Sequence, residues 1–148
     1  MKLLCTYLAF IRFLANLHQT FHWQSSGIQF YGLHLLFERL YNETVEEIDS
    51  IAEKIAGTFS VDLLSINEQM QLIQSITNKY CNANIDNLSM LQTALEAEED
   101  FIKLSKSIYD KMKEENLMTL GWDDLIMSLS NSHESHVYLL KQTLNQSN

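Results

Sequence analysis

The chain has 148 residues, of which 46% are hydrophobic and 20% charged, and its formal net charge is −9. This length suits a single domain, residues 1–148, with enough apolar side chains for a sizeable core. The negative charge and the scattered basic residues disfavour a nucleic-acid-binding surface and would instead attract cations. Proline is absent and glycine occurs four times, so an all-α domain is the simplest interpretation.

Cysteine content and hydropathy indicate a cellular compartment. Cys5 and Cys81 are too few for a disulfide scaffold. The opening MKLLCTYLAFIRFL has a lysine and an apolar run, but Arg12 interrupts the run and no small-residue cleavage site follows. No apolar run approaches the roughly 20 residues that span a bilayer. We therefore expect a cytoplasmic protein without a membrane segment.

The first half of the chain predicts two antiparallel helices. Apolar residues at three- and four-residue intervals indicate an amphipathic helix from about residue 3 to 25, followed by Gly27, which suits the left-handed end of a helix. A second, longer helix is predicted from about 28 to 56, with Gly57 closing it. The connection between them is short, so the two helices should lie side by side in opposite directions.

The second half predicts a long connector and two more helices. Residues 58–86 form the connector, with a short helix around NEQMQLIQSI and a polar stretch NANIDN. The third helix runs from about 88 to 113 and the fourth from about 122 to 144. Short, long and short connections are the order of a four-helix bundle with one crossover, so the fold class is all-α and ferritin-like. The apolar stripe of the third helix is expected along Leu91, Leu95, Ile102, Tyr109 and Met112, with Ala94, Phe101 and Ile108 beside it.

The second helix carries polar residues that its amphipathic pattern does not require. At 100° per residue, His34, Glu38, Asp49 and Glu53 fall at about 0°, 40°, 60° and 100° around the axis and so share one face. Imidazole and carboxylate ligands suit Fe(II), and also Zn(II) or Mn(II). This face therefore predicts a metal site.

One chain cannot complete that site. His34 and Asp49 are fifteen residues apart, which is roughly 22 Å along a straight helix. His22 can approach His34 across the turn at Gly27, but both histidines are far from the carboxylates. If two copies pack helix two against helix two around residues 41–43, the histidines of one chain meet Asp49 and Glu53 of the other. The spacing thus predicts a symmetric dimer with two identical sites.

The segments HWQSSGIQFYGLHLLFE and DSIAE resemble the signature of the Dps proteins, the DNA-binding proteins from starved cells, which are miniferritins. The family pattern is His-Trp, a second His twelve residues after the first, an Asp fifteen later and a Glu four later. His22, Trp23, His34, Asp49 and Glu53 match it. The motif covers about a fifth of the chain, while length and helix order agree over nearly all of it.

The resemblance implies a hollow shell of twelve subunits built from two-fold dimers, with ferroxidase sites at the dimer interfaces. Such proteins bind Fe(II), oxidise it with hydrogen peroxide or dioxygen, and store the ferric mineral, which protects against oxidative damage. His22, His34, Asp49 and Glu53 would be the catalytic metal ligands, with Glu38 as a further ligand. Trp23 would trap stray oxidising equivalents.

Several residues have competing interpretations. Glu38 has two equal interpretations: a metal ligand, or a carboxylate on a solvated helix face that pairs with Arg39 or Lys54 across an interface. His18 is read as structural rather than as an accessory ligand, and HESH at His133–His136 as solvated or shell-contact residues, because no suitably spaced carboxylate is evident. Asp123 and Asp124 either line an entry pore, as acidic residues here do in the family, or cap a helix.

Two alternatives to the ferroxidase remain from the sequence. A DNA-compacting scaffold is disfavoured, since MKLLCTYLAF begins directly in helix and LNQSN ends the chain, so neither end offers the basic arm that family members use. We therefore expect no DNA binding. A structural or interaction shell with an inactive metal site is the other alternative.

Overall fold

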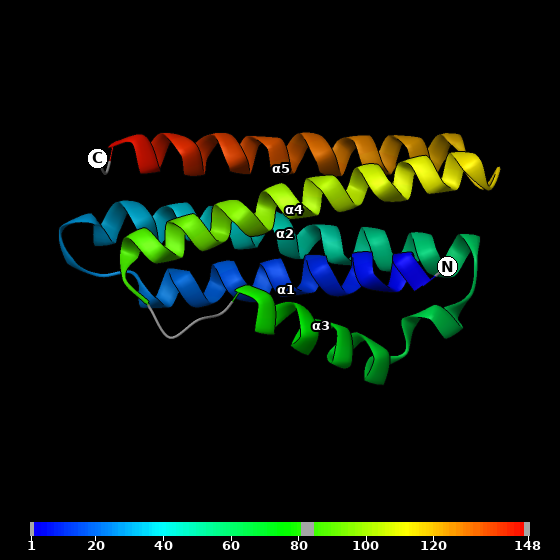
Figure 1. The fold of residues 1–148 in the computed structure, drawn as a ribbon, viewed down its shortest axis with the longest axis horizontal. Coiled ribbons are helices and arrows are strands. Elements are labelled where there is room, and N and C mark those ends of the chain that lie inside the picture. Colours follow the sequence, from blue (N-terminus) through cyan, green and yellow to red (C-terminus); the bar gives the residue numbers. More distant parts are fainter. Residues whose placement is uncertain (1, 81–84, 147–148) are drawn as a thin grey trace.

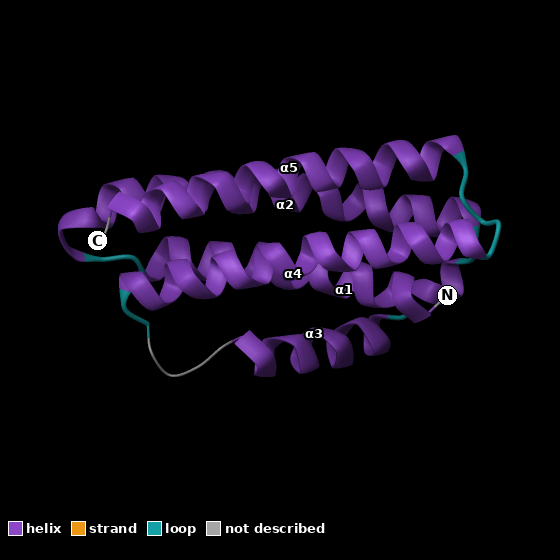
Figure 2. Ribbon diagram, turned by 45° about the horizontal axis from the view of Figure 1, so that its top comes forward, coloured by secondary structure: helices purple, strands orange, loops and turns teal. Residues whose placement is uncertain are grey.

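The computed structural model describes residues 2–80 and 85–146, and the helices in these ranges follow the predicted order. They are α1 (Lys2–Gln24), α2 (Phe30–Thr58), α3 (Ile66–Tyr80), α4 (Asn87–Glu114) and α5 (Leu120–Gln146), with 3-10 turns η1 (Gly27–Gln29) and η2 (Val61–Leu64). Four long helices lie side by side, and the shorter α3 packs outside against α1 (Figure 1; Figure 2). The predicted ferritin-like bundle with a helix in its crossover is confirmed. Of the polar stretch NANIDN, residues 82–84 lie outside the described residues, as does Cys81, while Cys5 is a buried free thiol.

The turn between α1 and α2 has the predicted backbone at Gly27, whose φ is +75°. An L side chain rarely adopts this conformation, so glycine is favoured there. Asn87, the first residue of α4, holds the turn in place: its amide donates to the Ser26 carbonyl at 2.7 Å and accepts from the Ser26 N–H at 3.2 Å. The expectation that Gly57 ends α2 is wrong, because the helix continues through it to Thr58.

The core is centred on α1, which contacts α2, α3 and α4. Tyr7, Ile11 and Leu14 of α1 are completely buried. On α4 the deepest stripe is Ala94, Phe101 and Ile108 with Leu91 and Met112, whereas Leu95, Ile102 and Tyr109 are only half-buried. The predicted main stripe was therefore rotated slightly away from the true core direction.

The crossover is fastened to the bundle by aromatic and ionic contacts at the end of α3. The Tyr80 ring stacks on Phe13 of α1 with centroids 5.3 Å apart. Lys79 and Tyr80 both donate to the Asp100 carboxylate of α4 at 2.7 Å. Among the residues described, no helix has both the length and the apolar character needed to cross a bilayer.

Candidate metal centre

His22 and His34 form a stacked pair at the turn between α1 and α2. Their ring centroids are 3.7 Å apart with 22° between the planes. Each Nδ1 donates to the backbone carbonyl of the other residue, at 2.8 Å from His22 and 2.9 Å from His34. The reciprocal bonds fix the orientation of both rings.

These bonds also determine which nitrogen can bind a metal. A carbonyl oxygen only accepts hydrogen bonds, so Nδ1 must carry the proton in each ring. In the neutral imidazole the lone pair is then on Nε2. Phe30 and Tyr41 approach the pair, with ring centroids 4.9 Å from His34 and 5.3 Å from His22. The result is a preorganised two-nitrogen donor set against aromatic rings.

The predicted carboxylates are on the same helix but not at the same place. The helix α2 is continuous from Phe30 to Thr58, so Asp49 remains roughly 22 Å along the axis from His34. Asp49 and Glu53 are exposed, and Glu38, one turn after His34, is half-buried. Arg39 donates to Glu43 at 2.9 Å within the chain. Within one subunit, Asp49 and the histidine pair are therefore too far apart to hold one ion together.

Exposed apolar side chains lie on the face of α2 that carries these residues. Tyr31 is 71% exposed, Leu35 43% and Val45 50%, and their positions fall on the same side of the helix as Glu38 and Asp49. Trp23, beside His22, is 66% exposed. Large apolar side chains exposed on one helix face, beside polar residues, are typical of an interaction surface.

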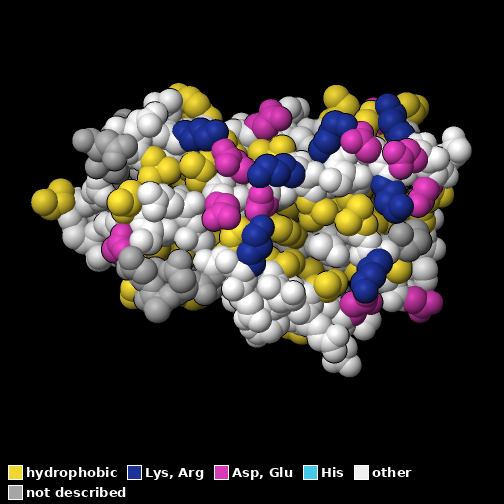
Figure 3. Space-filling view, in the orientation of Figure 1, with side chains coloured by type: hydrophobic (Ala, Val, Ile, Leu, Met, Phe, Trp, Pro, Cys, Tyr) yellow, Lys and Arg dark blue, Asp and Glu magenta, His cyan; other side chains and the backbone are white. Residues whose placement is uncertain are grey.

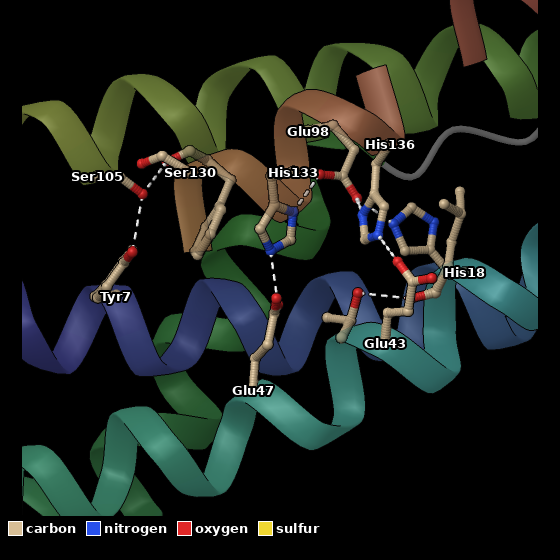
Figure 4. A network of polar contacts seen from close by, with 12 residues as sticks. Tyr7, His18, Glu43, Glu47, Glu98, Ser105, Ser130, His133 and His136 are labelled. Atoms are coloured by element: carbon tan, nitrogen blue, oxygen red, sulfur yellow. Dashed lines mark hydrogen bonds and ion pairs between the residues drawn. The ribbon is translucent and has the colours of Figure 1, made fainter. Parts of the chain in front are cut away.

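A second cluster of histidines and carboxylates lies inside the bundle, and every long helix contributes to it (Figure 4). Glu98 of α4 is at its centre, surrounded by His18 of α1 and by His133 and His136 of α5. All four side chains are completely buried. The expectation that His133 and His136 are solvated or shell-contact residues is wrong, and so is the inference that they lack carboxylate partners.

The contacts of Glu98 connect the cluster. Its Oε1 lies 2.6 Å from His18 Nε2 and 3.1 Å from His136 Nδ1, and its Oε2 contacts His133 Nδ1. Two carboxylates of α2 complete the cluster from the other side: Glu47 lies 2.8 Å from His133 Nε2, and Glu43 lies 2.8 Å from His136 Nε2. His18 is therefore directed at Glu98, one turn away from the His22–His34 pair.

The residues of the cluster differ in how their surroundings shift their pKa values. Burial acts to raise the pKa of Glu98, but the charge of His133 and hydrogen bonds from all three histidines outweigh it and hold that pKa well below its usual value. Burial acts to lower the pKa of His133, yet Glu98 and Glu47 raise it to about 9. For His18 burial dominates, and its pKa is lowered.

The sequence indicates this cluster through polar residues at core positions of two apolar stripes. Glu98 falls between Ala94 and Phe101 on the buried stripe of α4, and His133 and His136 fall between Leu129 and Leu140 on that of α5. Polar residues at core positions of an apolar stripe indicate a buried partner set.

Asp123 and Asp124 lie in the first turns of α5, half-buried and exposed respectively. The Trp122 N–H at this end donates to the side chain of Thr119 at 3.2 Å. Thr119 therefore caps the helix, so capping does not explain the two aspartates. A favourable interaction with the helix dipole and a cation path are the explanations that remain.

Comparisons with known proteins agree with the fold and the motif. A family model described as a ferritin-like domain matches residues 1–148. The chain is 29% identical over 127 residues to DNA protection during starvation protein 2 of Bacillus anthracis, covering 85% of this chain and 83% of that one. Dps from Staphylococcus aureus superposes with a TM-score of 0.82 at 20% identity, covering 97% and 93% of the two chains.

Another similar structure is named by its chemistry. The Vibrio cholerae O1 Dps protein, described as a member of a broad superfamily of ferritin-like diiron-carboxylate proteins, superposes with a TM-score of 0.77 at 22% identity, covering 96% of this chain and 86% of that one. With the motif, the helix order and the whole-length family match in agreement, the chain belongs to the ferritin-like family and, within it, to the Dps miniferritins.

Proposed function

We propose that the protein is a ferroxidase and iron-storage miniferritin that binds Fe(II) at sites shared between subunits and oxidises it, with hydrogen peroxide as the principal oxidant and dioxygen as the other. The observation that carries this proposal is the His22–His34 pair, whose Nδ1 atoms are both tied to carbonyls so that Nε2 is the donor atom in each ring. Imidazole and carboxylate together suit Fe(II), and would also accept Zn(II) or Mn(II).

The partner that completes the site is a second copy of the chain. Asp49 and Glu53 lie too far along α2 to reach the histidines of their own chain, but a two-fold axis near residues 41–43 would bring them to the partner's pair. The exposed Tyr31, Leu35 and Val45 would be covered in the same contact. We propose that six such dimers form a twelve-subunit shell in the cytoplasm, with Asp123 and Asp124 lining a cation path into it.

The reaction needs little from the protein beyond positioning. Each of two Fe(II) ions gives up one electron, and one hydrogen peroxide takes up both electrons and two protons to yield two waters. The paired transfer leaves no one-electron product, so hydroxyl radical is not released. Glu38, one turn from His34, would provide a further oxygen ligand, and Trp23 would intercept a stray oxidant.

DNA protection, named in the Bacillus anthracis relative, would follow here from removing Fe(II) and peroxide rather than from coating DNA. The chain carries a net charge of −9. On the face drawn in Figure 3, Lys and Arg side chains alternate with Asp and Glu instead of gathering into a basic patch. Ion pairs of the subunit include Lys141 with Glu99 and Lys103 with Asp100.

Anaerobic loading with Fe(II) followed by peroxide tests the function. The wild type should form ferric absorbance at two Fe(II) per peroxide. Asp49→Asn should slow the initial rate by about tenfold or more through loss of one ligand, whereas Asp110→Asn, which changes an exposed carboxyl group of α4, should leave it unchanged. A wild type without ferric product, or an Asp49→Asn variant at the wild-type rate, would show that the assignment is wrong.

A further inference from the structure

Three buried side chains from three helices present metal-binding atoms to one another inside each subunit. His18, Glu98 and His136 each offer a ligand atom, and these atoms all lie within 4.8 Å of one another. All three side chains are completely buried, and His18 Nδ1 is a buried nitrogen without a hydrogen-bond partner. We propose that they form a second metal site, separate from the shared site at the subunit boundary, that binds one divalent first-row transition-metal ion.

The spacing of the donors is close to what such an ion needs. Ligands at about 2.0–2.1 Å from a tetrahedral ion lie roughly 3.3 Å from one another. Glu98 Oε1 is 2.6 Å from His18 Nε2 and 3.1 Å from His136 Nδ1. The two contacts of Glu98 Oε1 would lengthen by only about 0.7 Å and 0.2 Å to reach the tetrahedral spacing.

The donors belong to a dense polar cluster. In His133 and in His136, both ring nitrogens face carboxylate oxygens. The two rings are completely buried with centroids 4.9 Å apart. An ion bound by His136 Nδ1 and Glu98 Oε1 would take the place of the hydrogen bond between these two atoms.

The surrounding residues are arranged as supports for such a site. Glu43 accepts from His136 Nε2 at 2.8 Å, which leaves Nδ1 as the donor atom toward Glu98. His133 donates from Nδ1 to the second oxygen of Glu98 and from Nε2 to Glu47. Carboxylate groups on the far side of a ligating histidine fix its tautomer and orientation. The ion would thus have two nitrogens and one oxygen from the protein, leaving a further position for water or a small ligand.

Donor chemistry and access define the class of ion. Two imidazoles with one carboxylate favour Fe(II), Zn(II), Mn(II) or Co(II) over Ca(II) and Mg(II), which prefer oxygen ligands. The Glu43 side chain is 39% exposed and that of Glu47 15%. These two carboxylates of α2 therefore connect the buried donors to the surface of the subunit, and offer an arriving cation its first contacts.

Co(II) is the probe for a direct test in crystals, with the full-length His22→Ala/His34→Ala variant used so that the shared site is removed. Anomalous diffraction at the cobalt edge should show a peak between His18, Glu98 and His136. This experiment distinguishes the two proposals. The peak can appear even if the protein is not a ferroxidase, and a ferroxidase can lack the peak. A map without a peak inside the bundle would overturn the proposal.

Solution binding with matched variants gives the second measurement. In the same His22→Ala/His34→Ala background, Co(II) titration followed by visible absorption should give one nitrogen-ligated ion per subunit. Adding Glu98→Gln, which keeps the size of the side chain, should weaken binding by about a hundredfold or more. Adding Ser105→Ala, which removes the buried bond to Tyr7 outside the ligand set, should leave it unchanged. Equal affinity in the Glu98→Gln and Ser105→Ala variants, with helicity intact, would contradict the proposal.

Discussion

The two histidine–carboxylate clusters differ in how many chains they need. The His22–His34 pair lies at the turn between α1 and α2, whereas Asp49 and Glu53 lie farther along α2, and in the proposed dimer a second chain brings them together. The cluster around Glu98 draws on α1, α2, α4 and α5 and is assembled by the fold of one subunit (Figure 4). In the proposed dimer, assembly would complete the first cluster, whereas the fold of one subunit completes the second.

The two clusters also differ in how much they contribute to the stability of the subunit. Exposed carboxylates such as Asp49 cost the subunit little free energy, because water solvates them. Glu98 is completely buried among three histidines, so its charge is part of the stability of the bundle. A substitution should therefore affect mainly activity at the first cluster and mainly folding at the second.

The largest expected effect is on stability, from Glu98→Ala. This substitution leaves His18, His133 and His136 buried without their shared partner, and removing one member of a buried ionic set costs about 3–5 kcal/mol. Urea unfolding in EDTA, followed by circular dichroism, measures the loss. Asp49→Ala is the control and should unfold at nearly the wild-type urea concentration. Equal midpoints for the two variants would remove the energetic distinction between the clusters.

The next effect is on activity, and it tests whether the first cluster is shared. His22→Ala/His34→Ala and Asp49→Ala/Glu53→Ala should each lose ferroxidase activity by about tenfold or more. After unfolding and reassembly in equal amounts, a site is intact when its histidines come from the second variant and its carboxylates from the first. Random pairing then restores roughly a quarter of the wild-type sites.

Native mass spectrometry of the mixture shows whether the two variants assemble together, and each variant reassembled alone is the control. Mixed assemblies without recovered activity would place the whole site within one chain. Recovery near a quarter requires that ligands come from two chains, because neither chain in the mixture has a complete set.

Sequence reasoning predicted the helices and the first cluster because both depend on regular spacing along the chain. The 3.6-residue period defined α1, α2, α4 and α5 to within about three residues at each end. His22, His34, Asp49 and Glu53 were identified because they follow one turn and one helix. The dimer geometry followed from the rise per residue alone, and it remains a prediction.

The second cluster was missed because its members are brought together by packing. His18 and Glu98 are eighty residues apart, and Glu98 and His133 thirty-five. Their contact depends on the rotation of α4 and α5 about their axes, and the predicted stripe of α4 was centred too near Leu95 and Ile102. A small error in rotation places Glu98 beside the core instead of in it.

A smaller effect is expected on the rate of iron entry. Asp123→Asn/Asp124→Asn should slow Fe(II) uptake severalfold at low salt, because a negatively charged entrance concentrates cations. The difference from wild type should shrink as salt screens the field. Stopped-flow oxidation over a salt series measures this, with Asp110→Asn as the control. If the rate of Fe(II) uptake by the wild type did not depend on salt, electrostatic steering by Asp123 and Asp124 would be contradicted.

The smallest effect concerns the polar cluster around Asp100, in which lysines face the carboxylate, and this cluster serves as a reference for the two proposed metal sites. Asp100 accepts from Lys79 at 2.7 Å, from Tyr80 at 2.7 Å and from Lys103 at 2.9 Å. Burial acts to raise its pKa, but these bonds outweigh burial and lower the pKa to about 2. Since the folded pKa lies below the unfolded value, the carboxylate stabilises the fold above about pH 4, and this contribution disappears as the pH falls toward 2.

Asp100→Asn should therefore lower the free energy of unfolding by about 1 kcal/mol at pH 7, a modest value because both lysines are mostly exposed to solvent. The difference from wild type should narrow between about pH 4 and pH 2 in urea titrations. It should be the same in EDTA and in Co(II), unlike that of Glu98→Ala, because no ion is bound there. A difference that stays constant down to pH 2 would mean that lost packing between α3 and α4, and not charge, explains the effect of the substitution.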